Sequence, residues 1–302
     1  MAGPTCIDKQ VRSRDWRLFL VPIMLVFLAS ACVRTSPTRR IEILHVAILP
    51  DQSEMRIRER YAPLVEHLRE HAGYSAELRI PGSYEELLQW FRDREVDLVL
   101  FGGITYVQAH LQSGAVPLVI RDVDGRSRSV LLVKDDSSAR TIRDLKGLPL
   151  AFGDRLSTTG HVMPRYFFGL LGIEPETYFG DIFYSGAHDL TAEWVRDGRI
   201  AAGISNSGIV AEMYADGRLK SGQLRILWES PPLADYVWAV PSDMSREDRS
   251  RIRDSFLHMN YRPEDAGLLR KLGASFYLPV DHADFAILED YLRRHESTGV
   301  TP

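Results

Sequence analysis

Three consecutive hydroxyl residues form the part of this sequence with the clearest chemical meaning. Ser157, Thr158 and Thr159 stand between an apolar run at 148–152, which predicts a strand, and an apolar-periodic run at 162–171, which predicts a helix. The first backbone N–H groups of a helix have no internal partners, and the helix dipole is positive at that end. With the added hydroxyl donors, such a turn suits a tetrahedral oxyanion like phosphate. The alternative is an ordinary Ser/Thr cap of the helix.

The first 32 residues predict a secretory leader that ends at a lipid-modified cysteine. Basic residues precede an almost wholly apolar run at 18–29, which is shorter than the about 20 residues of a membrane-spanning helix. A basic region, a short apolar region and small residues are typical of a secretory signal. Its end resembles a bacterial lipoprotein processing site, in which Cys32 becomes the lipidated first residue. The alternative is a plain cleaved signal in which Cys32 has no role.

The cysteine count favours lipid attachment over redox chemistry. Cys6 lies inside the leader, so the mature chain would have no second thiol with which Cys32 could form an internal disulfide. Residues 33–42 are polar and predict a short tether. We therefore expect a protein that is held by Cys32 at the periplasmic or extracellular face of a membrane.

The rest of the chain predicts an α/β protein. Strands are expected at 44–50, 76–80, 96–101, 116–120, 129–134, 148–152, 179–184, 200–204 and 236–240, and helices at 56–71, 84–91, 105–111, 158–171 and 188–196. This alternation implies a mostly parallel sheet with helices on both faces. The strands at 129–134 and 236–240 would carry the chain from one lobe to another and back. A net charge of −4 without a basic cluster argues against nucleic acid as a partner.

Over roughly residues 43–290, the sequence resembles the periplasmic phosphate/phosphonate/phosphite-binding proteins of ABC transporters. The matching stretches are 61–68, 96–103, 136–147, 151–164, 185–189 and 228–232. The resemblance implies a type II periplasmic binding protein, whose two α/β lobes are joined by two crossing strands and close over a ligand in the cleft between them. We expect lobe 1 at 43–133 plus 236–298, and lobe 2 at 134–235.

The resemblance also implies which residues bind the ligand. The matching positions are Tyr84, Thr105, Ser157, Thr158, Thr159, His188, Asn206 and Asp235. Thr105 follows a Phe-Gly-Gly turn and is expected to cap the next helix and aim its terminus at the cleft. His188 is expected to face the anion, and Asp235 is an acid on the return crossing. Without the resemblance, His188 would be read as a surface cap, Tyr84 as a half-buried helix residue and Asp235 as a solvated carboxylate.

Two departures from the family pattern bear on the ligand. Relatives that bind an aminoalkyl phosphonate have a carboxylate two residues after the matching Asn, where it can pair with the ammonium group. Gly208 holds that position here, and Ser127, followed by Arg128, replaces an expected aromatic residue. These differences argue against 2-aminoethylphosphonate and favour a small inorganic anion or a phosphonate without an amine. Oxyanions of sulfur, selenium or arsenic stay open.

The sequence thus predicts a monomeric, lipid-anchored solute-binding protein that delivers a small phosphorus oxyanion to an ABC permease. A protein that reports the ligand to a membrane sensor kinase is the alternative. We expect no cofactor, no metal site and no catalytic residue. His67 and His71 lack the intervening Glu of a zincin motif, and the sequence has no Gly-x-Ser-x-Gly elbow and no Walker loop.

The lipid anchor can be tested at its attachment point. Cys32→Ser should move the protein from the membrane fraction to the soluble extracytoplasmic fraction, because the only expected attachment site for lipid is lost. Fractionation followed by immunoblotting measures this change, and Cys6→Ser serves as the matched control. Membrane association that survives in Cys32→Ser would contradict the anchor.

Overall fold

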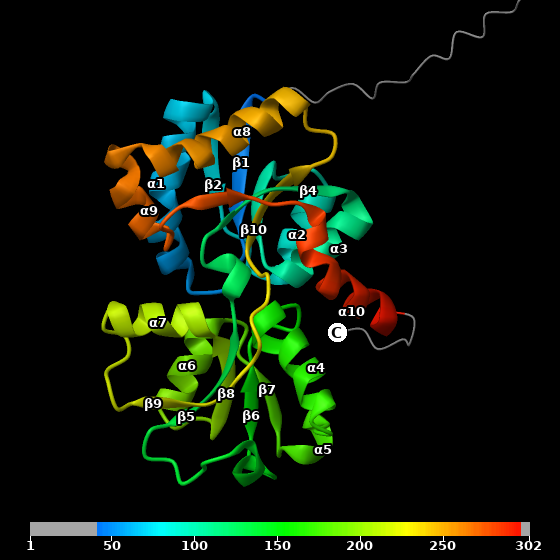
Figure 1. Cartoon of the computed structure of the whole chain (residues 1–302), viewed down its shortest axis with the longest axis vertical. Helices are drawn as coiled ribbons and strands as arrows, with labels where there is room; N and C mark the ends of the chain where they lie inside the picture. Colours follow the sequence, from blue (N-terminus) through cyan, green and yellow to red (C-terminus); the bar gives the residue numbers. More distant parts are fainter. Residues whose placement is uncertain (1–40, 297–302) are drawn as a thin grey trace, which may run out of the picture. The chain divides into compact units, whose positions relative to one another are not determined.

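The computed structural model describes residues 41–296, all within one compact unit, Pro37–Pro302. The predicted leader and most of the predicted tether lie outside the described residues. The described chain builds two α/β lobes, each around its own sheet (Figure 1). Among these residues, no helix is long and apolar enough to cross a membrane.

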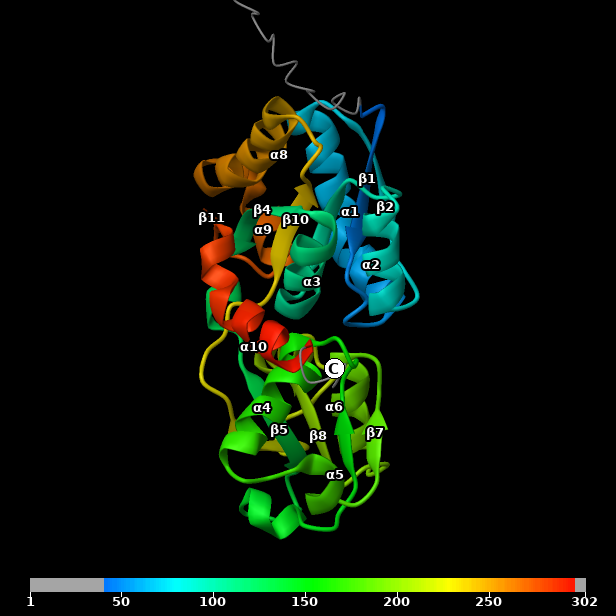
Figure 2. The same ribbon diagram turned by 90° about the vertical axis from the view of Figure 1, so that its right-hand side faces the viewer.

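The first sheet has the strand order β11-β4-β10-β3-β1-β2. Its strands are β1 (Ile43–Ile48), β2 (Ser75–Arg79), β3 (Leu98–Phe101), β4 (Ala115–Arg121), β10 (Val237–Pro241) and β11 (Tyr277–Pro279). Its helices are α1 (Glu54–Ala72), α2 (Tyr84–Arg92), α3 (Gly103–Ser113), α8 (Arg246–His258), α9 (Ala266–Lys271) and α10 (Ala286–Glu296). Helix α1 contacts α8 and α9, and α3 contacts α2 and α10, so the two groups of helices cover the two faces of the sheet (Figures 1 and 2).

The sequence explains why these elements form. Every residue of β3 is buried, which is typical of a central strand with helices on both faces. On α1, the buried residues Ile57, Tyr61, Leu64 and Leu68 recur every three or four positions and form one apolar stripe. The helix ends at Gly73, whose φ of 71° is the left-handed conformation that glycine adopts without strain.

The second sheet has the order β7-β6-β8-β5-β9. Its strands are β5 (Ser129–Lys134), β6 (Leu150–Phe152), β7 (Ile182–Tyr184), β8 (Ala202–Asn206) and β9 (Leu224–Glu229), and its helices are α4 (Met163–Leu170), α5 (Pro175–Tyr178), α6 (His188–Arg196) and α7 (Ser207–Ala215). Successive residues of β5 point to opposite faces. Val130 and Leu132 therefore enter one apolar cluster with α6 and α7, while Leu131 and Val133 enter another with Phe168 of α4.

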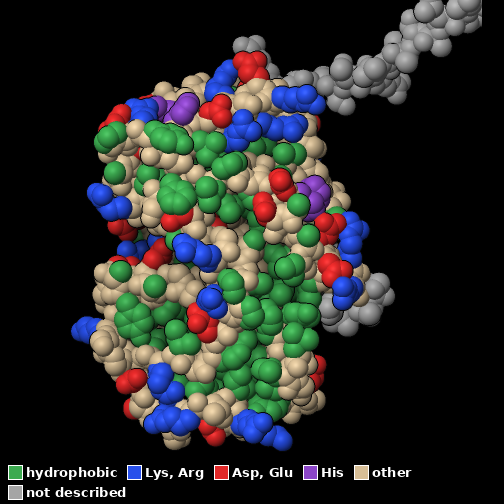
Figure 3. Space-filling view, viewed as in Figure 1, with side chains coloured by type: hydrophobic (Ala, Val, Ile, Leu, Met, Phe, Trp, Pro, Cys, Tyr) green, Lys and Arg blue, Asp and Glu red, His purple; other side chains and the backbone are tan. Residues whose placement is uncertain are grey.

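Short helical turns complete the described chain. They are η1 (Asp124–Arg126), η2 (Ile142–Leu145), η4 (Met259–Tyr261), η5 (Pro263–Asp265) and η6 (His282–Phe285), together with one π-helical turn, η3 (Thr158–Val162). On the face shown in Figure 3, apolar side chains gather over the half that carries the second sheet. Exposed apolar side chains of the second lobe include Tyr166, Leu170, Leu171, Phe183 and Ile226.

The sheets correct two expectations from the sequence. They are mixed and not mostly parallel, because β10 returns to the first sheet antiparallel to β3 and β4, and β5 lies antiparallel to β8 and β9. By this pairing, β5 belongs to the second sheet, so the expected lobe boundary after residue 133 is too late. The crossing segments are 122–128 and 230–236, which meet side by side through an antiparallel bridge between Ser127 and Leu233.

In both lobes, several helices begin just after a strand ends. In the first sheet β3 leads into α3. In the second, β6, β7 and β8 lead into η3, α6 and α7. Helices that follow the carboxyl ends of strands present their N-termini at that edge, which is where α/β proteins bind ligands. The fold therefore brings several positive helix ends to the boundary between the lobes.

Candidate ligand-binding site

Hydrogen bonds across the boundary show that the two lobes meet at these helix starts. The Ile104 N–H in the first turn of α3 donates to Thr158 Oγ1 at 3.0 Å. The His188 N–H at the start of α6 donates to the Asp51 carbonyl at 2.9 Å. Residues from both lobes are thus in direct contact around one buried polar cluster.

The turn at 157–159 lies inside this cluster. Ser157, Thr158 and Thr159 are each no more than 3% exposed. Ser157 is the N-cap, since its Oγ accepts the Gly160 N–H at 3.0 Å, so the ordinary capping role is real. Within the described chain, the N–H groups of Thr158 and Thr159 have no hydrogen-bond partner. The turn therefore combines hydroxyl groups with two free backbone donors.

His188 is a neutral donor that points at this turn. Its Nδ1 accepts the backbone N–H of Asn206 at 3.1 Å, which assigns the proton of the neutral ring to Nε2. Nε2 lies 3.3 Å from Ser157 Oγ, so the ring donates toward the turn. Burial lowers the pKa of His188 from 6.5 to about 4. His188 therefore lies against the turn at 157–159, and the surface-cap reading of this residue does not hold, because it is buried.

Asp235 is held by donors from both lobes. Its Oδ1 accepts the Gly103 N–H at 3.0 Å, and its Oδ2 accepts Thr159 Oγ1–H at 3.1 Å and Asn206 Nδ2–H at 3.4 Å. Burial raises its pKa, while the hydrogen bonds from the Gly103 N–H and from the Thr158 and Thr159 hydroxyls lower it. The carboxylate is buried and not a solvated loop acid.

Asn206 joins the two parts of the cluster. Its Oδ1 caps α7 by accepting the N–H groups of Gly208 and Ile209, at 2.8 and 3.3 Å. Its Nδ2 donates to Thr159 Oγ1 at 3.1 Å. The amide is therefore fixed in one orientation, with its donor end toward the turn at 157–159.

Of two further predicted site residues, Tyr84 lies beside the turn at 157–159, whereas Thr105 does not have the predicted capping role. Tyr84 begins α2, is buried and interacts with Ser157, and burial raises the pKa of its phenol well above the usual value. Thr105 does not cap α3, because the cap is Gly102 and the Thr105 hydroxyl donates back to the Gly102 carbonyl at 3.0 Å. The groups of α3 that point into the cluster are the backbone N–H groups of Gly103 and Ile104, which bond Asp235 and Thr158.

Asp51 belongs to the same cluster and was missed from the sequence. It follows β1, and burial raises the pKa of its carboxyl group to about 7. The phenol of Tyr236 lies beside this carboxyl group and lowers its pKa, although the phenol lacks a well-formed hydrogen bond. A polar residue directly after a buried strand was the available signal, because strand ends in α/β proteins commonly line sites.

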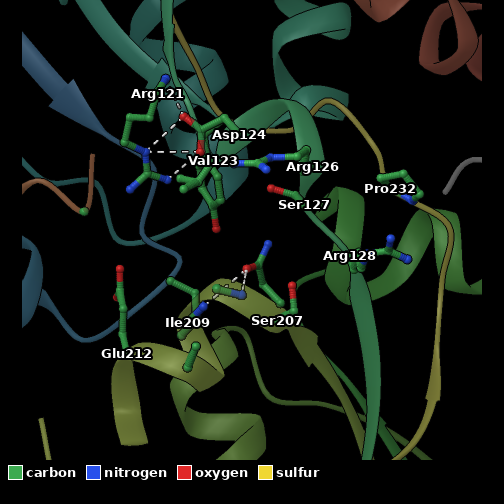
Figure 4. A pocket seen from close by; sticks show the side chains of 15 residues that line it. Arg121, Val123, Asp124, Arg126, Ser127, Arg128, Ser207, Ile209, Glu212 and Pro232 are labelled. Carbon is green, nitrogen blue, oxygen red and sulfur yellow. Dashed lines mark hydrogen bonds and ion pairs between the residues drawn. The ribbon is translucent and has the colours of Figure 1, made fainter. Parts of the chain in front are cut away.

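A cavity of about 600 Å³ adjoins the cluster at Asn206. Figure 4 shows Arg126 and Ser127 of the crossing segment on one side of it and Ser207 and Ile209 of α7 on the other. Arg128 also lines the cavity, and its Nη1 donates to the Ser230 carbonyl at 2.7 Å. In residues 41–296, no three His, Cys, Asp or Glu side chains are grouped to hold a metal ion.

The two-lobed fold with a buried polar site between the lobes is that of a periplasmic binding protein. A model of the family described as "ABC transporter, phosphonate, periplasmic substrate-binding protein" matches residues 46–285. The chain belongs to this family. It is therefore a periplasmic solute-binding component that works with an ABC permease, and not an enzyme.

Two relatives match this chain over about three quarters of its length and of their own. The probable ABC transporter phosphite binding protein PhnD1 of Prochlorococcus marinus is 29% identical over 237 residues, which cover 76% of this chain and 78% of the relative. The phosphate-import protein PhnD of Mycolicibacterium smegmatis is 26% identical and covers 77% of this chain and 78% of its own. The structure of PhnD1 in complex with methylphosphonate has a TM-score of 0.79 at 24% identity, covers 84% of this chain and 98% of its own, and supports the fold.

The protonation state of His188 can be measured directly. We expect its ring to keep the Nε2–H tautomer and to stay neutral from about pH 5 to 8. Since its pKa falls from 6.5 to about 4 on folding, its contribution to stability is present above pH 6.5 and is lost as the pH falls toward 4. Two-dimensional ¹H–¹⁵N spectra of the imidazole nitrogens would show this, with His188→Gln used for assignment. A ring that titrates near its ordinary pKa would contradict the assignment.

Proposed function

We propose that this chain is a lipid-anchored extracytoplasmic protein that captures a small phosphorus oxyanion, namely phosphate, phosphite or a phosphonate without an amine, for its ABC importer. The observation that carries the proposal is the buried turn at 157–159, where two free backbone N–H groups, hydroxyls and the Nε2–H of His188 converge. Preformed donors inside a site closed to water bind an anion more strongly than exposed donors do.

Asp235 supports phosphorus over sulfur as the central atom. Its carboxylate lies among the donors and accepts hydrogen bonds from Thr159 and Asn206. An oxyanion that shares these donors lies close to a buried carboxylate. The carboxylate repels a fully ionised ligand, but it can accept a hydrogen bond from a ligand that carries an O–H. Phosphate, phosphite and phosphonates can retain a proton near neutral pH, whereas sulfate does not.

The remaining parts of the proposal rest on other features. The leader motif that ends at Cys32 supports the lipid anchor. The site is built from both lobes of one chain, which supports a monomer. The exposed apolar side chains over the second lobe are of the kind found at protein contacts and are suited to the permease. A sensor kinase as partner would use the same ligand site, and no feature of the described chain favours it.

Removing hydroxyl groups from the turn tests the proposed anion site. Ser157→Ala and Thr159→Ala should each cost at most about 1.5–3 kcal/mol of binding free energy for phosphate, phosphite or methylphosphonate, the usual size for a hydrogen bond to a charged group, because the ligand displaces the partners that both hydroxyls already have. Thr177→Ala is the matched control, because it removes an exposed hydroxyl from α5. Calorimetric titration would measure the affinities, with sulfate expected to bind far more weakly. Unchanged affinity in both turn variants would remove the turn from the site.

The discrimination against amines depends on Gly208. Wild type should bind 2-aminoethylphosphonate more weakly than methylphosphonate, because burying an ammonium group without a partner is costly. Gly208→Glu should narrow or reverse this difference. Gly208→Gln is the control, since in both variants the added Cβ meets Asn206 Oδ1 at 3.1 Å and only the charge differs. A tenfold or greater preference of the wild type for the aminated ligand, in competitive calorimetry, would refute the role of Gly208.

A further inference from the structure

The cavity beside Asn206 is too large for a tetrahedral oxyanion alone. Its volume of about 600 Å³ lies within the about 300–1,000 Å³ that is typical of sites for small organic molecules. Its walls are the first crossing segment, the start of α7 and the return crossing at Pro232 and Tyr236. Asn206 lines the cavity and also donates to Thr159 Oγ1, so the cavity opens directly beside the anion turn.

The carboxylates in the wall of this cavity are already neutralised by partners. Asp124 and Arg121 form a buried bidentate pair, with Arg121 Nη2 at 2.7 Å from Asp124 Oδ1. Glu212 of α7 pairs with Arg60 of α1. Neither carboxylate is therefore free to attract a cation on a ligand.

The arginines on the crossing segment are not neutralised to the same degree. Arg126 is exposed at the rim, and its guanidinium has no ion pair or hydrogen bond within the described chain. Arg128 holds the Ser230 carbonyl and lies 3.7 Å from the half-exposed Glu229, so its charge is only weakly balanced. The uncompensated charge at this end of the cavity is positive.

Hydroxyl groups line the cavity between the arginines and the anion turn. Ser127 is 8% exposed, and neither it nor Ser207 has a side-chain hydrogen bond in the described residues. Tyr236 is buried, and its hydroxyl lacks a well-formed hydrogen bond. Gly208 contributes no side chain. This wall therefore supplies donors and positive charge.

We infer that this cavity receives the organic substituent of a phosphonate, and that the substituent carries a carboxylate or another acidic group that reaches Arg126. The inference rests on the proposed function, in which the turn at 157–159 holds the phosphonate end. The two ends of such a ligand meet different donors. Backbone N–H groups, hydroxyls and a neutral imidazole hold the inner end, and a guanidinium with neighbouring hydroxyls holds the outer end. The guanidinium of Arg126 would then make the affinity higher for acidic substituents than for neutral ones.

The test compares methylphosphonate with 3-phosphonopropionate by calorimetric titration of the full-length chain. Wild type should bind 3-phosphonopropionate at least about tenfold more tightly, the lower limit for a hydrogen bond to a charged group. Arg126→Gln should remove about that factor for 3-phosphonopropionate and leave the affinity for methylphosphonate unchanged. Arg143→Gln, which removes the charge of another exposed arginine far from the cavity in the sequence, should change neither affinity.

The possible failures are distinguishable. If methylphosphonate binds and 3-phosphonopropionate binds no better, the cavity inference is overturned while the proposed function stands. If Arg126→Gln weakens both ligands equally, the residue does not recognise the substituent and the inference is also overturned. If neither ligand binds wild type at millimolar concentration, the cavity inference falls. The same result would exclude phosphonates from the proposed function. Titrations with phosphate and phosphite would then test whether the protein binds either inorganic anion.

Discussion

The buried carboxylate of Asp235 is the interaction on which the closed arrangement of the lobes depends. It accepts a backbone N–H from Gly103 in the first lobe, and it accepts Thr159 and Asn206 from the second, while its own backbone belongs to the return crossing. A buried charge is costly unless several donors satisfy it. Because these donors come from separate segments, Asp235 is fully satisfied only when the lobes are together. Closure and the formation of the donor cluster are therefore one event.

The hydrogen bonds already present in this cluster affect the free energy that an anion could gain by binding. Ser157 and Thr159 already have partners in His188 and Asp235, so a ligand gains only the difference between its own hydrogen bonds and those that it displaces. The N–H groups of Thr158 and Thr159 have no partner within the described chain, so a ligand that binds them displaces no protein group. In the proposed site, we therefore expect the backbone donors, whose positions the π-helical turn fixes, to favour the bound state most.

The sequence was informative wherever the determinants were local. The turn at 157–159 could be predicted because three hydroxyl residues stand between an apolar run typical of a strand and an apolar pattern typical of a helix, all within some 25 residues. Long-range contacts were not accessible in this way. The partners of Asp235 lie 29 to 132 residues away, and the pairing that assigns β5 to the second sheet joins Ser129 with Asn206. Thr105 was misassigned because the backbone, starting from Gly102, determines where α3 begins, and no side-chain signal reports that.

The anion turn also obtains its positive potential without a cationic side chain. Its donors are hydroxyls, backbone N–H groups and an imidazole that burial keeps neutral. The same buried cluster holds the carboxyl groups of Asp235 and Asp51, and the carboxyl group of Asp154 accepts the Leu156 N–H just before the turn. Helix ends act over about one turn, whereas a guanidinium attracts an anion over a Debye length of about 8–10 Å. In the proposed site, an anion is held strongly only while the lobes keep water out, and its binding weakens as soon as they part. For a protein that must surrender its ligand to a permease, neutral donors that work only in the closed state couple release to opening.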